Sequence, residues 1–184
     1  MALANYAASG LNERTAYLEL DGHGEMRHWK ETDETGRFKD SGIDYFPDCA
    51  REDIPILWNR DYDKIIMDFG NAYIRFREEL LRCDRRVFLL NLNPWQAFAA
   101  RNMVSAVMGR EWGGIMPLYV SVNAQRKEKR AIEKEFQISV TDLPVLSNPK
   151  RVRSDEFPCM DFLIGGPAAG LNKRRLLIPI RKRR

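Results

Sequence analysis

Several features that would place a chain in a large protein class are missing from this sequence. No apolar run approaches the roughly 20 residues that a transmembrane helix needs, and the N-terminus lacks the basic segment of a signal peptide. The two histidines, His23 and His28, and the three cysteines have no partners at the spacing of zinc ligands. These absences predict a cytoplasmic protein with reduced thiols and no zinc site.

The absence with the greatest consequence concerns phosphate binding. No Gly-rich loop of the form GxxxxGK(S/T) occurs in the 184 residues. Where such a loop is present, backbone N–H groups at a helix N-terminus and the lysine of the loop hold the phosphates of a nucleotide. Without these contacts we expect nucleotide binding to be weak or absent.

Composition and charge predict one globular domain with a basic tail. The hydrophobic share of 44% and the charged share of 30% are ordinary for a soluble domain, and we expect a single domain over residues 1–172. Residues 173–184 hold seven basic and no acidic side chains, whereas the whole chain carries only +4. The rest of the chain is therefore mildly acidic, so the basic net charge of the whole chain is no evidence for a nucleic-acid interface on the domain.

The spacing of apolar residues predicts alternating helices and strands, which is typical of an α/β fold with a mostly parallel sheet and helices on both faces, in three layers. Residues 22–42 are predicted to be a long polar loop containing about one helical turn. In the helix after Pro94 we expect Trp95, Phe98, Ala99, Val104 and Val107 to face the core. The expected helices are 1–10, 72–83, 94–108 and 127–136, and the expected strands are 14–20, 43–46, 64–68, 86–92 and 116–123, with short extended pieces at 138–140 and 143–145.

Two of the expected strands end in acidic residues followed by glycine. Strand 64–68 ends on Asp68, and strand 14–20 is followed by Asp21. Ligands of open α/β sheets bind outside the carboxyl ends of the strands. We therefore expect strands 14–20, 64–68, 86–92 and 116–122 to be neighbours in one sheet, with Asp21, Asp68 and Asn123 at its carboxyl edge.

The order and spacing of these segments resemble the ParA/MinD-type P-loop ATPase superfamily over residues 1–148. The similar segments are Tyr17–Gly24, Tyr62–Gly70, Leu89–Trp95, Tyr119–Asn123 and residues 138–144. The deviant Walker A loop of that family, KGGxGK(S/T), is missing, although the family places it directly before the first helix. The resemblance thus implies a Rossmann-like P-loop NTPase fold that is N-terminally incomplete and lacks its first strand.

The resemblance also implies roles for four residues. Asp21 and Asp68 correspond to catalytic positions, Asp68 and Glu19 to positions around Mg²⁺, and Asn123 to a contact with the base of ATP. Glu19 stands where the family has aspartate, which puts the fine geometry around the metal in question. For each residue a structural reading stands beside the functional one, because strand-end Asp and Asn residues often only order a turn.

The expected role is regulatory or positional, in an ATPase-like protein that is inactive as an ATPase in this form. The alternative is a non-catalytic interaction module that kept the fold and lost nucleotide binding. Expected partners are a protein assembly and a second copy of the chain. Residues 173–184 would bind an anionic membrane surface or nucleic acid, or have no partner; polybasic segments gain about 1 kcal/mol per basic residue near anionic lipid.

Overall fold

The computed structural model describes residues 1–111, 114–146 and 148–165. Contacts within it divide the chain into two compact units. The first unit comprises Met1–Arg82 and Ser147–Ser154, and the second comprises Cys83–Leu146 and the chain from Asp155 onward. The prediction of one domain over residues 1–172 stays a prediction, and the predicted basic tail at 173–184 lies outside the described residues.

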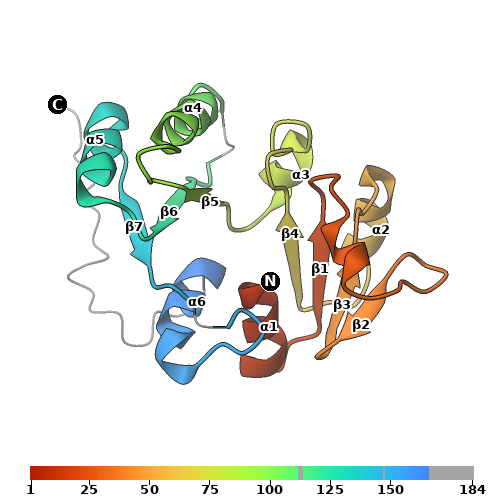
Figure 1. Cartoon of the computed structure of the whole chain (residues 1–184). Coiled ribbons are helices and arrows are strands. Elements are labelled where there is room, and N and C mark those ends of the chain that lie inside the picture. Colours follow the sequence, from red (N-terminus) through yellow and green to blue (C-terminus); the bar gives the residue numbers. More distant parts are fainter. Residues whose placement is uncertain (112–113, 147, 166–184) are drawn as a thin grey trace. The chain divides into compact units, whose positions relative to one another are not determined.

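The first unit is built on a four-stranded sheet with the strand order β2-β3-β1-β4. The central strand β1 is parallel to its neighbours β3 and β4, while β2 runs antiparallel to β3 at one edge (Figure 1). The strands are β1 (Thr15–Glu19), β2 (Phe38–Asp40), β3 (Ile43–Phe46) and β4 (Lys64–Asp68), and the helices are α1 (Ala2–Asn5), which continues as a π-helical turn (Tyr6–Gly10), α2 (Ile54–Trp58) and α3 (Arg77–Arg82).

The core of the first unit is an aromatic and aliphatic cluster on one face of the sheet. All five residues of β1 are buried, which explains why this strand reads as a nearly continuous apolar run. Tyr17 of β1 lies opposite Tyr45 of β3 in register, and Phe38 stacks on Tyr45 with ring centroids 4.9 Å apart. The buried members of the cluster are Ala4, Tyr17, Met26, Phe38, Ile43 and Tyr45.

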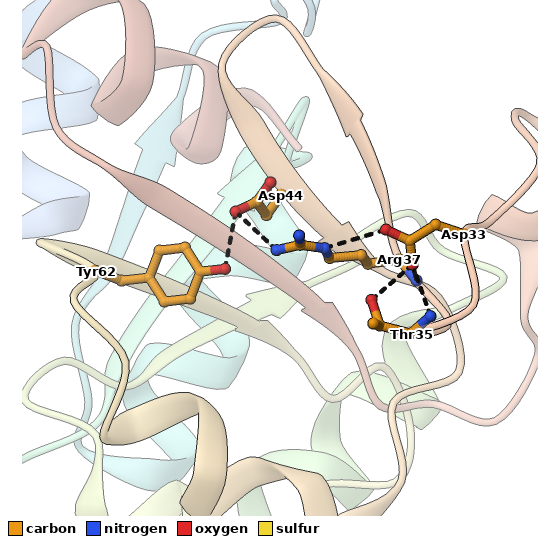
Figure 2. Close-up of polar contacts among 5 residues, drawn as sticks. All are labelled: Asp33, Thr35, Arg37, Asp44 and Tyr62. Carbon is orange, nitrogen blue, oxygen red and sulfur yellow. Dashed lines mark hydrogen bonds and ion pairs between the residues drawn. The ribbon is translucent and has the colours of Figure 1, made fainter.

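The loop over residues 22–42 is more ordered than its polar composition predicts. It contains a 3₁₀ helix (Glu25–His28) and strand β2. Its central part is held by Asp33, whose Oδ1 accepts hydrogen bonds from the backbone N–H of Thr35 at 2.8 Å and from the Thr35 hydroxyl at 2.6 Å. Figure 2 shows the rest of this network. Arg37 pairs with Asp33 at 3.2 Å and with Asp44 at 3.6 Å, and the Tyr62 hydroxyl donates to Asp44 at 2.8 Å.

This network predicts that the loop loosens in acid. The Thr35 hydroxyl, with backbone N–H groups and Arg37, holds the pKa of Asp33 at about 2, below its ordinary value of 3.8. Because the folded pKa is depressed, the carboxylate stabilises the loop above pH 3.8, and this contribution is lost as the pH falls from there through 2. Cleavage of the loop by pepsin should therefore rise over that interval.

The matched variants for this test are Asp33→Asn and Glu34→Gln. Asp33→Asn should make cleavage of the loop much less dependent on pH, whereas Glu34→Gln, which alters an exposed neighbour, should behave like the unmodified chain. The same pH profile for all three proteins would show that Asp33 does not hold the loop.

The second unit is built on a three-stranded parallel sheet with the order β5-β6-β7. Helices α4 and α5 lie side by side, and Arg101 of α4 pairs with Glu128 and Glu135 of α5 at 3.3 and 3.0 Å (Figure 1). The strands are β5 (Val87–Leu90), β6 (Leu118–Val122) and β7 (Val140–Leu143), and the helices are α4 (Ala97–Met108), α5 (Arg126–Phe136) and α6 (Phe157–Ile164).

Two predictions about the arrangement of strands have different outcomes. Strands β1 and β4 are parallel neighbours, as are β5 and β6, so this part is confirmed. The prediction that all four strands share one sheet is wrong, because β4 pairs only with β1 and β5 only with β6 among the described residues. Apolar patterning identifies a strand but carries little information about which strand it pairs with.

The orientation predicted for the helix after Pro94 is confirmed for Val104 and Val107 and wrong for Trp95, Phe98 and Ala99. Its buried residues are Ala97, Ala100, Val104 and Val107, whereas Trp95 is 94% exposed and Phe98 is 75% exposed. Two apolar stripes with helical spacing overlap in this segment, and the core selects the one with the smaller side chains. Helix α6, which the sequence reading missed, follows Glu156 and carries Pro158 in its first turn.

Within the described ranges, no helix combines the length and the apolar character that crossing a bilayer requires.

Candidate functional site

The candidate site lies at the carboxyl edge of the first sheet, where β1 and β4 end together. Glu19 and Asp68 are register partners, and the Leu20 N–H donates to the Asp68 carbonyl at 2.8 Å. The predicted placement of Asp21 and Asp68 at one edge is therefore confirmed. Gly70 has φ of +46°, and a Cβ atom at this position would lie 2.7 Å from the Asp21 Cβ. Glycine is thus required here for the turn after β4 to approach Asp21.

The carboxylate of Asp68 is held by donors from its own chain. The Tyr17 hydroxyl donates to Oδ2 at 2.5 Å, and the Gly70 N–H donates to Oδ1 at 3.1 Å. Burial raises the pKa of Tyr17, and the charge and the hydrogen bond of Asp68 raise it further, so the phenol is protonated and donates at neutral pH. Asp68 remains exposed on the outer side of the edge.

Asp21 pairs with His23 in the turn after β1. The His23 backbone N–H donates to Oδ1 at 2.9 Å, and the ring Nδ1 lies 2.9 Å from Oδ2. Partial burial raises the pKa of Asp21, but the hydrogen bonds from His23 outweigh this effect and leave the pKa below its ordinary value. The hydrogen bond to Asp21 in turn raises the pKa of His23.

Glu19 is buried beneath the loop, with only 6% of its surface exposed. Its Oε1 accepts the N–H of Glu25 at 3.0 Å, and its Oε2 accepts the N–H of Met26 at 3.4 Å. These N–H groups belong to the first turn of the 3₁₀ helix, where the helix itself supplies no acceptor. Glu19 therefore caps that helix and links the loop to β1.

Among the described residues, the acidic side chains at this edge do not gather into a cluster of metal ligands. No three His, Cys, Asp or Glu residues of the described ranges gather in a group that could hold a metal ion. Both oxygens of Asp68 and both oxygens of Glu19 accept hydrogen bonds from the chain. The assignments of ATP and Mg²⁺ as cofactors, of Asp21 and Asp68 as catalytic residues, and of Glu19 as a metal-site residue stay predictions.

Asn123 belongs to the other sheet. It follows β6 in the second unit, is exposed, and adopts a left-handed conformation with φ of +53°. The left-handed region favours asparagine among residues with side chains, which gives Asn123 a structural reason to be at this turn. The prediction of one sheet edge shared with Asp21 and Asp68 is wrong for Asn123, and its contact with a base stays a prediction.

The sequence reading missed an open pocket of about 550 Å³ in the first unit. The loop over residues 22–42 and the segment after β3 form it, and no motif marks these residues. Arg27 and Asp48 both line it and pair with each other at 3.0 Å, and Cys49 is another lining residue. Burial raises the pKa of the Cys49 thiol to about 12, so this thiol is protonated at neutral pH and a poor nucleophile.

The chain has an α/β fold of open, mainly parallel sheets, consistent with the Rossmann-like and P-loop NTPase-like class. The MinD cell division protein of Aquifex aeolicus is a similar solved structure, with a TM-score of 0.50 and 13% sequence identity over 94% of this chain and 82% of that chain. At this identity the likeness shows a MinD-like fold alone. No protein-family model and no curated protein matches the chain.

Proposed function

We propose that this chain is a ParA/MinD-like protein with a regulatory or positioning role, and that it does not hydrolyse ATP in this form. One observation carries the proposal: the carboxylates at the edge of β1 and β4 are bound by donors of their own chain, in a sequence without a phosphate-binding loop. Hydrolysis of a nucleoside triphosphate depends on positioned cations and N–H donors around the transferred phosphate. The residues at this edge are mainly acceptors.

The geometry assigns an ordering role to each carboxylate at the edge. Asp68 fixes the turn after β4, Asp21 fixes the turn after β1, and Glu19 fixes the start of the 3₁₀ helix. Together they hold three backbone segments in one arrangement, and an interaction surface needs such pre-organisation to bind without a large ordering cost. This favours a role in which partners recognise the edge and the adjoining loop.

The second candidate is a non-catalytic interaction module that no longer binds nucleotide at all. The capping role of Glu19 favours it, because that residue stands at the position where the resemblance implies a metal-site carboxylate. The two candidates differ in whether a weak nucleotide site remains around Asp68. In both, the partner is a protein, and binding of an anionic membrane or nucleic acid by residues 173–184 is a separate proposal.

A thermal-shift titration with ATP and Mg²⁺, run beside a phosphate-release assay, tests the proposal. A ligand at 100 times its dissociation constant stabilises a protein by about 2.7 kcal/mol, so tight binding would be easy to detect. We expect no phosphate release and, at most, a small shift at millimolar nucleotide.

The variants Asp68→Asn and Asp84→Asn decide between the two candidates. A small shift that Asp68→Asn abolishes and Asp84→Asn leaves unchanged would support a residual nucleotide site. No shift in any of the proteins would favour the module without nucleotide. Steady ATP turnover that depends on Asp68 would refute the proposal.

A further inference from the structure

Helix α4 presents two large aromatic side chains to solvent. Trp95, just before the helix, is 94% exposed, and Phe98, in its first turn, is 75% exposed. Exposed aromatic side chains are enriched in protein interfaces, and their burial there supplies much of the binding energy. The outer face of α4 consists of Phe98, Ala99, Asn102, Ser105 and Ala106, which lie opposite the buried residues of the helix at 3.6 residues per turn. Trp95 and Gly109, which flank the helix at its two ends, are counted with this face.

The outer face of α4 carries no charge. Between Asn91 and Gly109 the sequence has one charged residue, Arg101, in a chain of which 30% is charged. Arg101 is directed to α5, where it pairs with Glu128 and Glu135. The neighbouring helix α5 is different, because its exposed residues include Arg126, Lys127 and Arg130. Depletion of charge together with exposed aromatic residues distinguishes the centre of an interface from ordinary surface.

We propose that a second copy of this chain covers the outer face of α4, with the two helices antiparallel about a two-fold axis at Asn102. The face is complementary to itself, because its N-terminal half carries the large side chains and its C-terminal half carries only small ones. Asn102 is seven residues from both Trp95 and Gly109, and four from both Phe98 and Ala106. An antiparallel pair therefore places Trp95 over Gly109 of the second copy.

The same symmetry places Phe98 over Ala106 of the second copy and Ala99 over its Ser105, so every large side chain meets a small one. Small residues allow two helices to approach to the 8–10 Å or so that helix packing requires. The two Asn102 amides meet at the axis, where each has a donor and an acceptor for the other. Two identical charged faces would repel each other, whereas this face has no charge to oppose self-association.

The area is sufficient for a specific interface. A Trp or Phe side chain buries about 150–250 Å² when covered, so the four aromatic side chains of two copies supply about 600–1,000 Å². The small residues between them bring the total to the level of about 1,000 Å² at which specific interfaces begin. A membrane surface fits less well, because the face has no basic residue to meet anionic lipid. This inference does not rest on the proposed function.

Sedimentation velocity of the full chain over a hundredfold range of concentration tests the proposal. We expect a monomer–dimer equilibrium that Phe98→Glu weakens at least tenfold, since it would bury a charge against Ala106. Ile56→Glu is the matched control, because Ile56 is 57% exposed on α2 in the first unit and should leave the equilibrium unchanged. Phe98 is exposed, so Phe98→Glu should melt like the unmodified chain when both are monomeric.

A cysteine cross-link tests the register. Two Asn102→Cys chains should form a disulfide-linked dimer on oxidation, because their Cα atoms meet at the axis. Two Gln96→Cys chains should not form this dimer. Position 96 lies six residues from the axis at Asn102 in each copy, so at 1.5 Å per residue the two cysteines are about 18 Å apart along the helices. This distance is beyond the reach of a disulfide. The unmodified chain, with its three native cysteines, is the control for other cross-links.

Three results would overturn the proposal. The first is a chain that stays monomeric at the highest concentration. The second is a dimer that Phe98→Glu leaves intact, which would place the interface elsewhere. The third is a monomer that sediments with vesicles of phosphatidylcholine and phosphatidylglycerol and loses this binding in Trp95→Ser, which would make lipid the occupant of the face.

Discussion

Replacing Ile43 by alanine should lower the free energy of unfolding by about 2–5 kcal/mol, the range for truncating a fully buried isoleucine. Ile43 begins β3, opposite Thr15 of the central strand, and has no exposed surface. It belongs to the buried cluster with Tyr17 and Phe38. Removal of three methyl and methylene carbons leaves a cavity there that these rings, already packed against one another, cannot readily fill.

Ile66→Ala is the informative comparison. The sequence alone places Ile66 in the middle of a central strand and predicts the same loss of about 2–5 kcal/mol for it. In the structure β4 is the last strand of the first sheet, and Ile66 is only partly buried against the cluster. We therefore expect Ile66→Ala to cost less than Ile43→Ala. Urea unfolding gives both losses of stability, provided that the dependence of the unfolding free energy on urea concentration is the same for the two variants. A larger loss for Ile66→Ala than for Ile43→Ala would mean that β4 is not an edge strand in solution.

Replacing Glu19 by alanine should lower the free energy of unfolding by about 1–3 kcal/mol, because one buried and one partly buried N–H donor would lose their acceptor. The donors are the N–H groups of Glu25 and Met26, at 3.0 and 3.4 Å. Glu19→Gln keeps one carbonyl oxygen and should cost less. Glu34→Ala, which truncates an exposed glutamate of the same loop, should change stability by no more than about 0.5 kcal/mol.

Two measurements separate the capping role of Glu19 from a role in metal binding. Hydrogen exchange at the Glu25 and Met26 amides should quicken in Glu19→Ala and much less in Glu19→Gln, both with and without Mg²⁺. Unchanged exchange and stability in Glu19→Ala, together with the loss of a stabilising effect of Mg²⁺, would contradict the capping role and restore the metal-site assignment.

The sequence predicted where strands begin and end better than it predicted which side chains are buried. Strands β3 and β4 begin and end at the predicted residues, and Asp21 and Asp68 meet at one edge as predicted, because adjacent parallel strands must end on the same side. The aromatic residues of α4 were placed on the wrong side, since Trp95 and Phe98 follow helical spacing as well as Val104 and Val107 do. Periodicity reports that a stripe exists, and packing selects between two stripes.

The sequence by itself determined the α/β class, the positions of most strands and the lack of a phosphate-binding loop, because local patterning and short motifs encode these features. Only the tertiary structure decided that the strands form two sheets, that Glu19 caps a helix, and that Asp33 orders a loop that reads as solvated. Strands that pair, and side chains that hydrogen-bond, can lie far apart in the sequence. Their pairing depends on how several segments pack together, and no single segment encodes this. These contacts can therefore be identified only in the folded chain.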